Sequence, residues 1–197
     1  MTISDGDLIQ KGGRDFRVNI INDTDMRAPW EEHDGHGVVS DWATRGKLPC
    51  ERVLANDRSS YRYYDIKATM AIARADGWGL CDKEKAKLAD RLGRPPTKRE
   101  ITAESVERDF EHLKGWCEDR WCWVGVVVTD ITDDPDADND YEHALWGIES
   151  SSEEHLEEVA EEFVDTILGD LAEAEALKRK ELAEVTYWES RDVETVP

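Results

Sequence analysis

The amino-acid sequence predicts an α+β fold, in which an antiparallel sheet of about five strands carries helices on one face and a long acidic helix follows at the C-terminus. Two observations lead to this prediction. Segments with strand-like patterns occur mainly as neighbouring pairs that can form hairpins, and helical patterns lie between these pairs. Strands and helices also do not alternate strictly, as they would in a parallel sheet.

The length of 197 residues fits one domain with an appendage. We expect a flexible N-terminus over residues 1–14, because Gly12 and Gly13 precede the first patterned segment. A single α+β domain is expected over residues 15–168, and a helical extension over residues 169–197, either as a new helix that starts at Asp170 or as a continuation of the acidic helix. The eight tryptophans and 39% hydrophobic residues are enough to form a core.

Five strands are expected in chain order. Residues 14–21 alternate apolar and polar side chains, which is typical of a half-buried strand. Residues 51–57 and 59–65 predict a hairpin, with turn-forming residues between them. Residues 120–132 hold the clearest β-branched run and suit the centre of a sheet, and residues 142–150 return as their hairpin partner.

Two helices are expected between the hairpins. Asp65 can cap a helix that continues to about Asp76, with Gly77 as its stop. Thr97 and Glu100 fit a capping box at the start of the second helix. Apolar residues at helical spacing continue that helix towards Gly115, and they are Val106, Phe110 and Leu113.

The segment "SSEEHLEEVAEEFVD", residues 151–165, predicts the start of the acidic helix, with Ser151 as N-cap and Glu154 three residues later. Its apolar stripe consists of Leu156, Val159, Ala160, Phe163 and Ile167. Its carboxylates form two columns, Glu153, Glu157, Glu161 and Asp165 in one and Glu154, Glu158 and Glu162 in the other. Like charges four residues apart destabilise a helix by about 0.2–0.5 kcal/mol per pair, so the pattern does not serve helix stability.

The negative charge is concentrated in the C-terminal third. The formal net charge is −21, and residues 133–197 hold 22 acidic and four basic residues. We therefore expect a partner-binding acidic surface made of the two carboxylate columns and of the preceding turn residues Asp133, Asp134, Asp136 and Asp138. The alternative is a solvated face that only aids solubility. Direct binding to nucleic acid is not expected, because the sequence predicts no basic groove.

A turn-rich segment over residues 22–50 holds the other candidate site. His33 and His36 flank a turn, with Glu31, Glu32 and Asp41 near in sequence. Two imidazoles and several carboxylates are weak candidates for a divalent metal site or for acid–base chemistry. The alternative is that these residues form side-chain hydrogen bonds that hold the long loop in place. No catalytic residue, metal or cofactor is expected.

Composition and motif spacing indicate the cellular compartment in which the protein is expected. The spacings of the four cysteines match no zinc-ligand motif, and reduced thiols are the default in a cytosolic chain. The N-terminus has no signal-peptide pattern, and no apolar run approaches the ~18 residues of a membrane helix. We therefore expect a cytoplasmic protein.

Three stretches carry a resemblance. They are "PWEEHDGHGVVSDW", "ERVLANDRSSYRYYDIKATMAIARADGWG" and "WVGVVVTDI…LWGIESSSEEHLEEVAEE". Over about residues 15–168 the chain resembles a family of small, acidic, uncharacterised proteins of tailed bacteriophages. Cys50 stands where the family pattern suggests a small residue such as Gly. The resemblance implies a phage protein in the cytoplasm of an infected bacterium, and it implies no catalytic residue.

These observations lead to one hypothesis and two alternatives. The hypothesis is a non-enzymatic phage inhibitor that presents a DNA-like carboxylate surface to a basic, nucleic-acid-binding host protein, such as a restriction or CRISPR complex. One alternative is an accessory enzyme or metal-binding protein built on His33 and His36. The other is an adaptor that forms a homodimer through its C-terminal helix.

Overall fold

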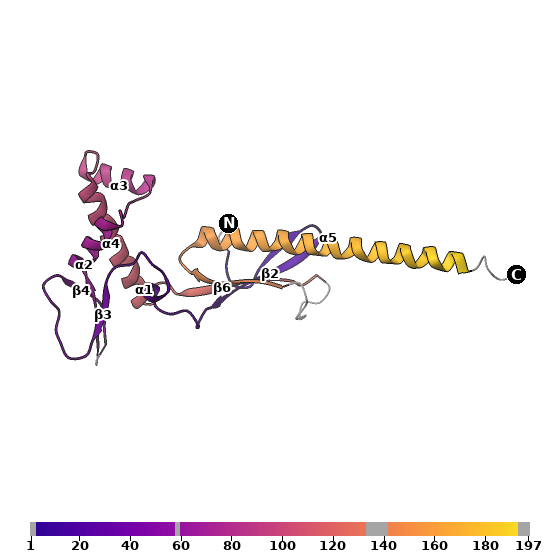
Figure 1. The fold of residues 1–197 in the computed structure, drawn as a ribbon, viewed down its shortest axis with the longest axis horizontal. Helices are drawn as coiled ribbons and strands as arrows, with labels where there is room; N and C mark the ends of the chain where they lie inside the picture. Colours follow the sequence, from indigo (N-terminus) through magenta and orange to yellow (C-terminus); the bar gives the residue numbers. More distant parts are fainter. Residues whose placement is uncertain (1–2, 58–59, 133–141, 193–197) are drawn as a thin grey trace. The chain divides into compact units, whose positions relative to one another are not determined.

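The structure is a computed structural model that describes residues 3–57, 60–132 and 142–192, and the chain divides into two compact units (Figure 1). Unit 1 combines Met1–Asp23 with Trp123–Pro197, and unit 2 is Thr24–Cys122. The predicted α+β class, the antiparallel pairing and the long C-terminal helix are confirmed. The strands form two sheets, however, and the chain forms two units where one domain was expected over residues 15–168.

Unit 1 contains a four-stranded antiparallel sheet in the order β1-β2-β6-β7. The strands are β1 (Asp7–Lys11), β2 (Arg14–Asn22), β6 (Trp123–Asp130) and β7 (Glu142–Glu149). Strand β6 pairs with β2 on one side and β7 on the other, so its β-branched run lies inside the sheet as predicted.

Strand β1 corrects the prediction of a flexible N-terminus over residues 1–14. Its partner residues in β2 run from Lys11↔Arg14 to Asp7↔Val18. Gly12 and Gly13 both have positive φ, 62° and 80°, which is the backbone of a tight two-residue hairpin turn. The two glycines therefore connect strands, where the sequence suggested a loose start.

Helix α5 (Glu153–Asp192) packs on one face of this sheet, and Figure 1 shows it alongside the strands of unit 1. The predicted stripe is confirmed, with Leu156, Val159, Ala160 and Ile167 buried and Phe163 half-buried. Val164, which the prediction omitted, is fully buried. The sheet contributes Phe16, Val18, Val124, Val126, Val128 and Ile148 to the same core. Each such burial is worth about 1.5–3 kcal/mol.

The start of α5 lies one residue later than predicted. The helix begins at Glu153, so Ser152, one residue after the predicted cap Ser151, precedes it and accepts the first helical hydrogen bond from Leu156 N at 3.0 Å. The helix also runs without a break through the predicted boundary at residue 169. Side chains 175–187 are exposed, so this part of the helix contributes nothing to the core.

Unit 2 contains a three-stranded antiparallel sheet in the order β3-β5-β4 and four helices within residues 24–57 and 60–122. The elements are α1 (Pro29–Glu32), β3 (Val39–Trp42), β4 (Glu51–Asn56), β5 (Tyr61–Asp65), α2 (Ile66–Ala75), α3 (Asp82–Leu92) and α4 (Lys98–Cys117). The predicted hairpin of β4 and β5 is confirmed. Helices α2 and α4 pack with β4 over a core of Leu54, Tyr64, Ala73, Val106, Phe110 and Leu113.

The predicted helix starts in unit 2 are confirmed at the level of single hydrogen bonds. The Asp65 side chain accepts from Ala68 N at 2.9 Å and so caps α2. Thr97 and Glu100 cap α4 reciprocally, with Thr97 N donating to Glu100 Oε2 at 2.8 Å and Glu100 N donating to Thr97 Oγ1 at 3.4 Å. These side-chain hydrogen bonds fix the positions at which α2 and α4 begin.

Candidate functional site

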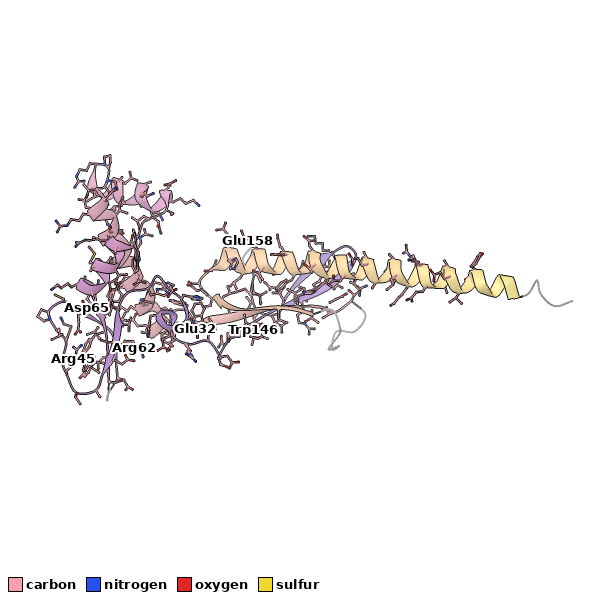
Figure 2. The ribbon with its side chains drawn as sticks, viewed as in Figure 1. Glu32, Arg45, Arg62, Asp65, Trp146 and Glu158 are labelled. Atoms are coloured by element: carbon pink, nitrogen blue, oxygen red, sulfur yellow. The ribbon has the colours of Figure 1, made fainter. Side chains whose placement is uncertain are left out.

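The carboxylates of α5 lie on the side of the helix opposite its buried stripe, and Figure 2 shows Glu158 on the side away from the strands of unit 1. Six of the seven carboxylate residues from Glu153 to Asp165 are exposed, and Glu157 is half-buried. The buried stripe fixes the orientation of the helix, so the acidic residues form a defined surface on a rigid element.

The first carboxylate column lies beside β1. Glu157 and Glu161 line a groove of about 580 Å³ together with residues of β1, including Leu8. Asp165 forms an ion pair with Lys11 of β1, with Oδ1 and Nζ 2.6 Å apart. This column is therefore partly engaged within unit 1.

The second column, Glu154, Glu158 and Glu162, is more open. All three residues are exposed, and 71% of the Glu158 side chain is accessible to solvent. The Glu158 carboxylate lies 3.7 Å from His155 Nδ1, at the edge of ion-pair distance. We call Glu154, Glu158 and Glu162 the outer column.

The charge divides between the two units more sharply than along the sequence. Unit 1 holds 27 acidic and seven basic residues, whereas unit 2 holds 19 and 18. Almost all of the net charge therefore belongs to unit 1, which carries α5. The predicted turn residues Asp133, Asp134, Asp136 and Asp138 belong to this unit but lie outside the described residues.

The loop with His33 and His36 is organised around Asp109 of α4. His36 Nδ1 lies 2.7 Å from Asp109 Oδ1, and Gly37 N donates to Oδ2 at 2.8 Å. Tyr64 Oη donates to the same Oδ2 at 2.7 Å. Burial, and then the nearby Asp109 charge, raise the pKa of Tyr64, so its hydroxyl remains a donor. These bonds join the loop, β5 and α4.

Gly37 makes this arrangement possible. A Cβ atom at this position would lie 2.4 Å from the Tyr64 ring, far inside van der Waals contact. His36 also stacks on His112, with ring centroids 5.9 Å apart, and His112 stacks on Trp121 at 4.5 Å. Packing and hydrogen bonding thus account for His36 and Gly37 of the motif "HDGHG", in line with the structural alternative for His36.

The two predicted histidines are not brought together with other ligands. His33 is exposed, whereas His36 is held by Asp109. Across residues 3–57, 60–132 and 142–192, no group of three or more His, Cys, Asp or Glu side chains could hold a metal ion.

Unit 2 also contains a buried ion pair that was not predicted from the sequence. Both Glu51 oxygens accept hydrogen bonds from Arg45, at 2.6 and 2.7 Å, and Leu48 N adds a third bond at 2.8 Å. The guanidinium lies 4.2 Å from the Trp42 ring centroid. The Arg45 hydrogen bonds lower the pKa of Glu51 to about 2 despite its burial. The pair fixes the loop before β4.

No described helix combines the length and the apolar composition needed to cross a membrane. No family model, no curated protein and no solved structure matches the chain. The geometry of the acidic face and the charge of unit 1 therefore carry the functional argument.

Proposed function

We propose that this chain is a non-enzymatic acidic protein that occupies the nucleic-acid-binding surface of a basic partner with the outward face of α5. The observation that supports this most is the outer column: three exposed glutamates on a helix whose opposite side is anchored in a core. A carboxylate surface of this kind attracts Lys and Arg side chains that otherwise bind phosphates.

The spacing supports imitation of a nucleic-acid backbone. Residues four apart on a helix are separated by about 6 Å along its axis, and phosphates follow one another every ~3.4 Å along the axis of one DNA strand. Two neighbouring columns, offset by one residue, together approach that density. The first column would contribute Glu153, Glu157, Glu161 and Asp165, and the turn residues Asp133, Asp134, Asp136 and Asp138 would extend the surface.

The repulsion between carboxylates on α5 also favours binding to a basic partner. Like charges four residues apart destabilise α5 by about 0.2–0.5 kcal/mol per pair. A basic surface placed against the outer column would remove that repulsion on binding. Electrostatic attraction would speed association and make the complex sensitive to salt.

The biological setting of the proposal comes from the resemblance to tailed-bacteriophage proteins. In the cytoplasm of an infected bacterium, a natural target class is a host defence protein that binds nucleic acid. Inhibition would follow from competition, because the acidic face and the nucleic acid would occupy the same basic groove.

A dimeric adaptor is the second candidate, and one observation favours it. Leu177, Leu182 and Val185 of α5 are exposed by 53% or more. Light scattering tests it: a dimer that becomes monomeric in the double variant Leu177→Glu, Leu182→Glu supports this candidate, and a monomeric wild type excludes it.

Charge reversal of the outer column tests the proposed function. In the variant Glu154→Lys, Glu158→Lys, Glu162→Lys, capture of a basic partner from host cells and inhibition of that partner are expected to disappear. The matched control is Glu173→Lys, Glu181→Lys, Glu184→Lys, which changes the net charge equally on exposed positions of the same helix. Equal loss in both variants would show that overall charge, and not the outer column, determines binding.

A further inference from the structure

A basic pocket of about 850 Å³ lies in unit 2, where the end of α2 meets the start of α4. Three cationic side chains line it, and they are Arg74, Lys98 and Arg99. Trp78 and Ile101 contribute apolar surface. Among the described residues, none that lines the pocket is a carboxylate, although the chain has a net charge of −21.

The arginines of this pocket differ from the other arginines of unit 2. Within residues 24–57 and 60–122 there are ten arginines, and eight of them form an ion pair with a carboxylate. The two that have no ion pair among the described residues are Arg74 and Arg99, and both line the same pocket. Two exposed guanidinium groups without a carboxylate partner and an exposed lysine thus lie around one concavity and give it a positive charge.

Local structure places these groups. Gly77, with φ of 72°, ends α2, and Trp78 N donates back to Ala73 O at 2.8 Å, which is the hydrogen bond of a Schellman motif. This turn brings Trp78 beside Arg74. Lys98 and Arg99 occupy the first turn of α4, where the helix dipole adds to the positive potential.

The nearest acidic residue on α4 is already engaged. Both oxygens of Glu100 accept from Arg94, at 2.6 and 3.0 Å, and Oε2 also accepts from Thr97 N and Thr97 Oγ1, each at 2.8 Å. Glu100 therefore stabilises the preceding turn through Arg94 and Thr97 and forms no ion pair with Lys98 or Arg99.

We propose that this pocket binds a small phosphorylated ligand of the nucleotide class. Guanidinium groups bind phosphate oxygens in pairs of hydrogen bonds, and lysine adds a further charge. The half-buried Trp78 offers an apolar, aromatic surface to a base, and the volume lies within the range of small-molecule sites. Three cations around one concavity suit two or three phosphates better than a long backbone, which needs a continuous basic track.

Calorimetric titration of the full-length protein with ATP, without divalent cations, tests the proposal. Tripolyphosphate, adenosine and a single-stranded oligonucleotide serve as comparison ligands. We expect ATP to bind at least tenfold more tightly than tripolyphosphate, and adenosine to bind weakly. Arg74→Gln and Arg99→Gln should each lower the affinity for ATP about tenfold, because each loses charge-assisted hydrogen bonds. Lys83→Gln, an equal charge change at an exposed residue of α3 outside the pocket, should have no effect.

Four results would overturn the proposal: no binding of ATP at millimolar concentration, equal affinity for ATP and tripolyphosphate, tighter binding of the oligonucleotide than of ATP, or an effect of Lys83→Gln equal to that of Arg99→Gln. Circular dichroism of each variant shows that the fold is retained. The pocket belongs to unit 2 and the outer column to unit 1. The ATP titration and the charge-reversal experiment therefore test the two proposals independently.

Discussion

Asp109 shows how a single carboxylate can organise a segment that has little regular structure. It accepts hydrogen bonds from Gly37 N and Tyr64 Oη, and its other oxygen lies 2.7 Å from His36 Nδ1. Hydrogen bonds to a charged group are worth about 1.5–3 kcal/mol each. His36 therefore has a structural role, which requires close approach of the backbone and the Tyr64 ring at Gly37.

Replacement of Gly37 by alanine tests this account. The new Cβ would lie 2.4 Å from Tyr64, so either the ring or the loop must shift, and the hydrogen bonds to Asp109 weaken. We expect the free energy of unfolding to fall by about 2 kcal/mol or more. Urea denaturation measures it. Gly46→Ala is the matched control, because a Cβ there meets no atom within 4 Å and the change should stay within about 0.5 kcal/mol.

The Arg45–Glu51 pair predicts a dependence of stability on pH. Arg45, as the main cause, lowers the pKa of Glu51 from 4.5 to about 2. Because the folded-state pKa is lowered, the stabilisation is complete above pH 4.5 and is lost as the pH falls towards 2. The difference in free energy of unfolding between wild type and Glu51→Gln should therefore be constant from pH 5 to 7 and should shrink between pH 4.5 and 2.

The control for this titration is Glu107→Gln. Glu107 pairs with Arg52 at 2.6 Å, but 53% of its side chain is exposed, so solvent screens the pair. The difference in free energy of unfolding between wild type and Glu107→Gln should change little between pH 4.5 and 2. A Glu51→Gln difference that stays constant down to pH 2 would contradict the role assigned to Arg45.

At the scale of elements, α5 combines an anchored face with a repulsive one. Its buried face can be predicted from the sequence, because apolar side chains recur at helical spacing.

Helix α3 was not predicted, because its sequence lacks such an apolar pattern. Among its residues only Leu88 is buried, and its start at Cys81 lacks the usual cap residue types, although a capping box with Glu84 is present. An exposed helix leaves no apolar stripe to detect.

The repulsive face of α5 gives a stability prediction that is separate from binding. Glu154→Gln, Glu158→Gln, Glu162→Gln removes like-charge pairs four residues apart, and glutamine retains helix propensity. The free energy of unfolding should stay equal or rise by up to about 1 kcal/mol at low salt. Thermal unfolding at 20 mM and 500 mM salt measures it, and the gain should shrink at high salt. A loss of more than 1 kcal/mol would mean that these carboxylates stabilise the fold.

At the scale of the whole molecule, the sequence predicts the local elements better than their assembly. The β4–β5 hairpin, the caps of α2 and α4, and the β6–β7 pairing join segments close in sequence, and turn and capping residues mark them. The pairing of β2 with β6 joins residues about one hundred positions apart, across the whole of unit 2. Local sequence patterns do not indicate such a pairing. The division of the chain into two units was therefore not predicted.

The same distinction between local pattern and tertiary packing applies to the candidate surface. The two carboxylate columns were evident from spacing alone, because all their members belong to one helix. The ion pair of Asp165 with Lys11 and the groove between β1 and α5 depend on tertiary packing, so the sequence could not distinguish the first column from the outer column. That distinction now directs the functional test to Glu154, Glu158 and Glu162.

The central claim is that the outer face of α5 and a nucleic acid compete for one basic surface. The most direct measurement is displacement: a partner captured on the immobilised wild-type protein is challenged with increasing duplex DNA or RNA at fixed salt. We predict that nucleic acid releases the partner stoichiometrically and that the variant Glu154→Gln, Glu158→Gln, Glu162→Gln retains at most a tenth of the binding. A partner that stays bound at saturating nucleic acid, or binds the variant equally well, would contradict the account.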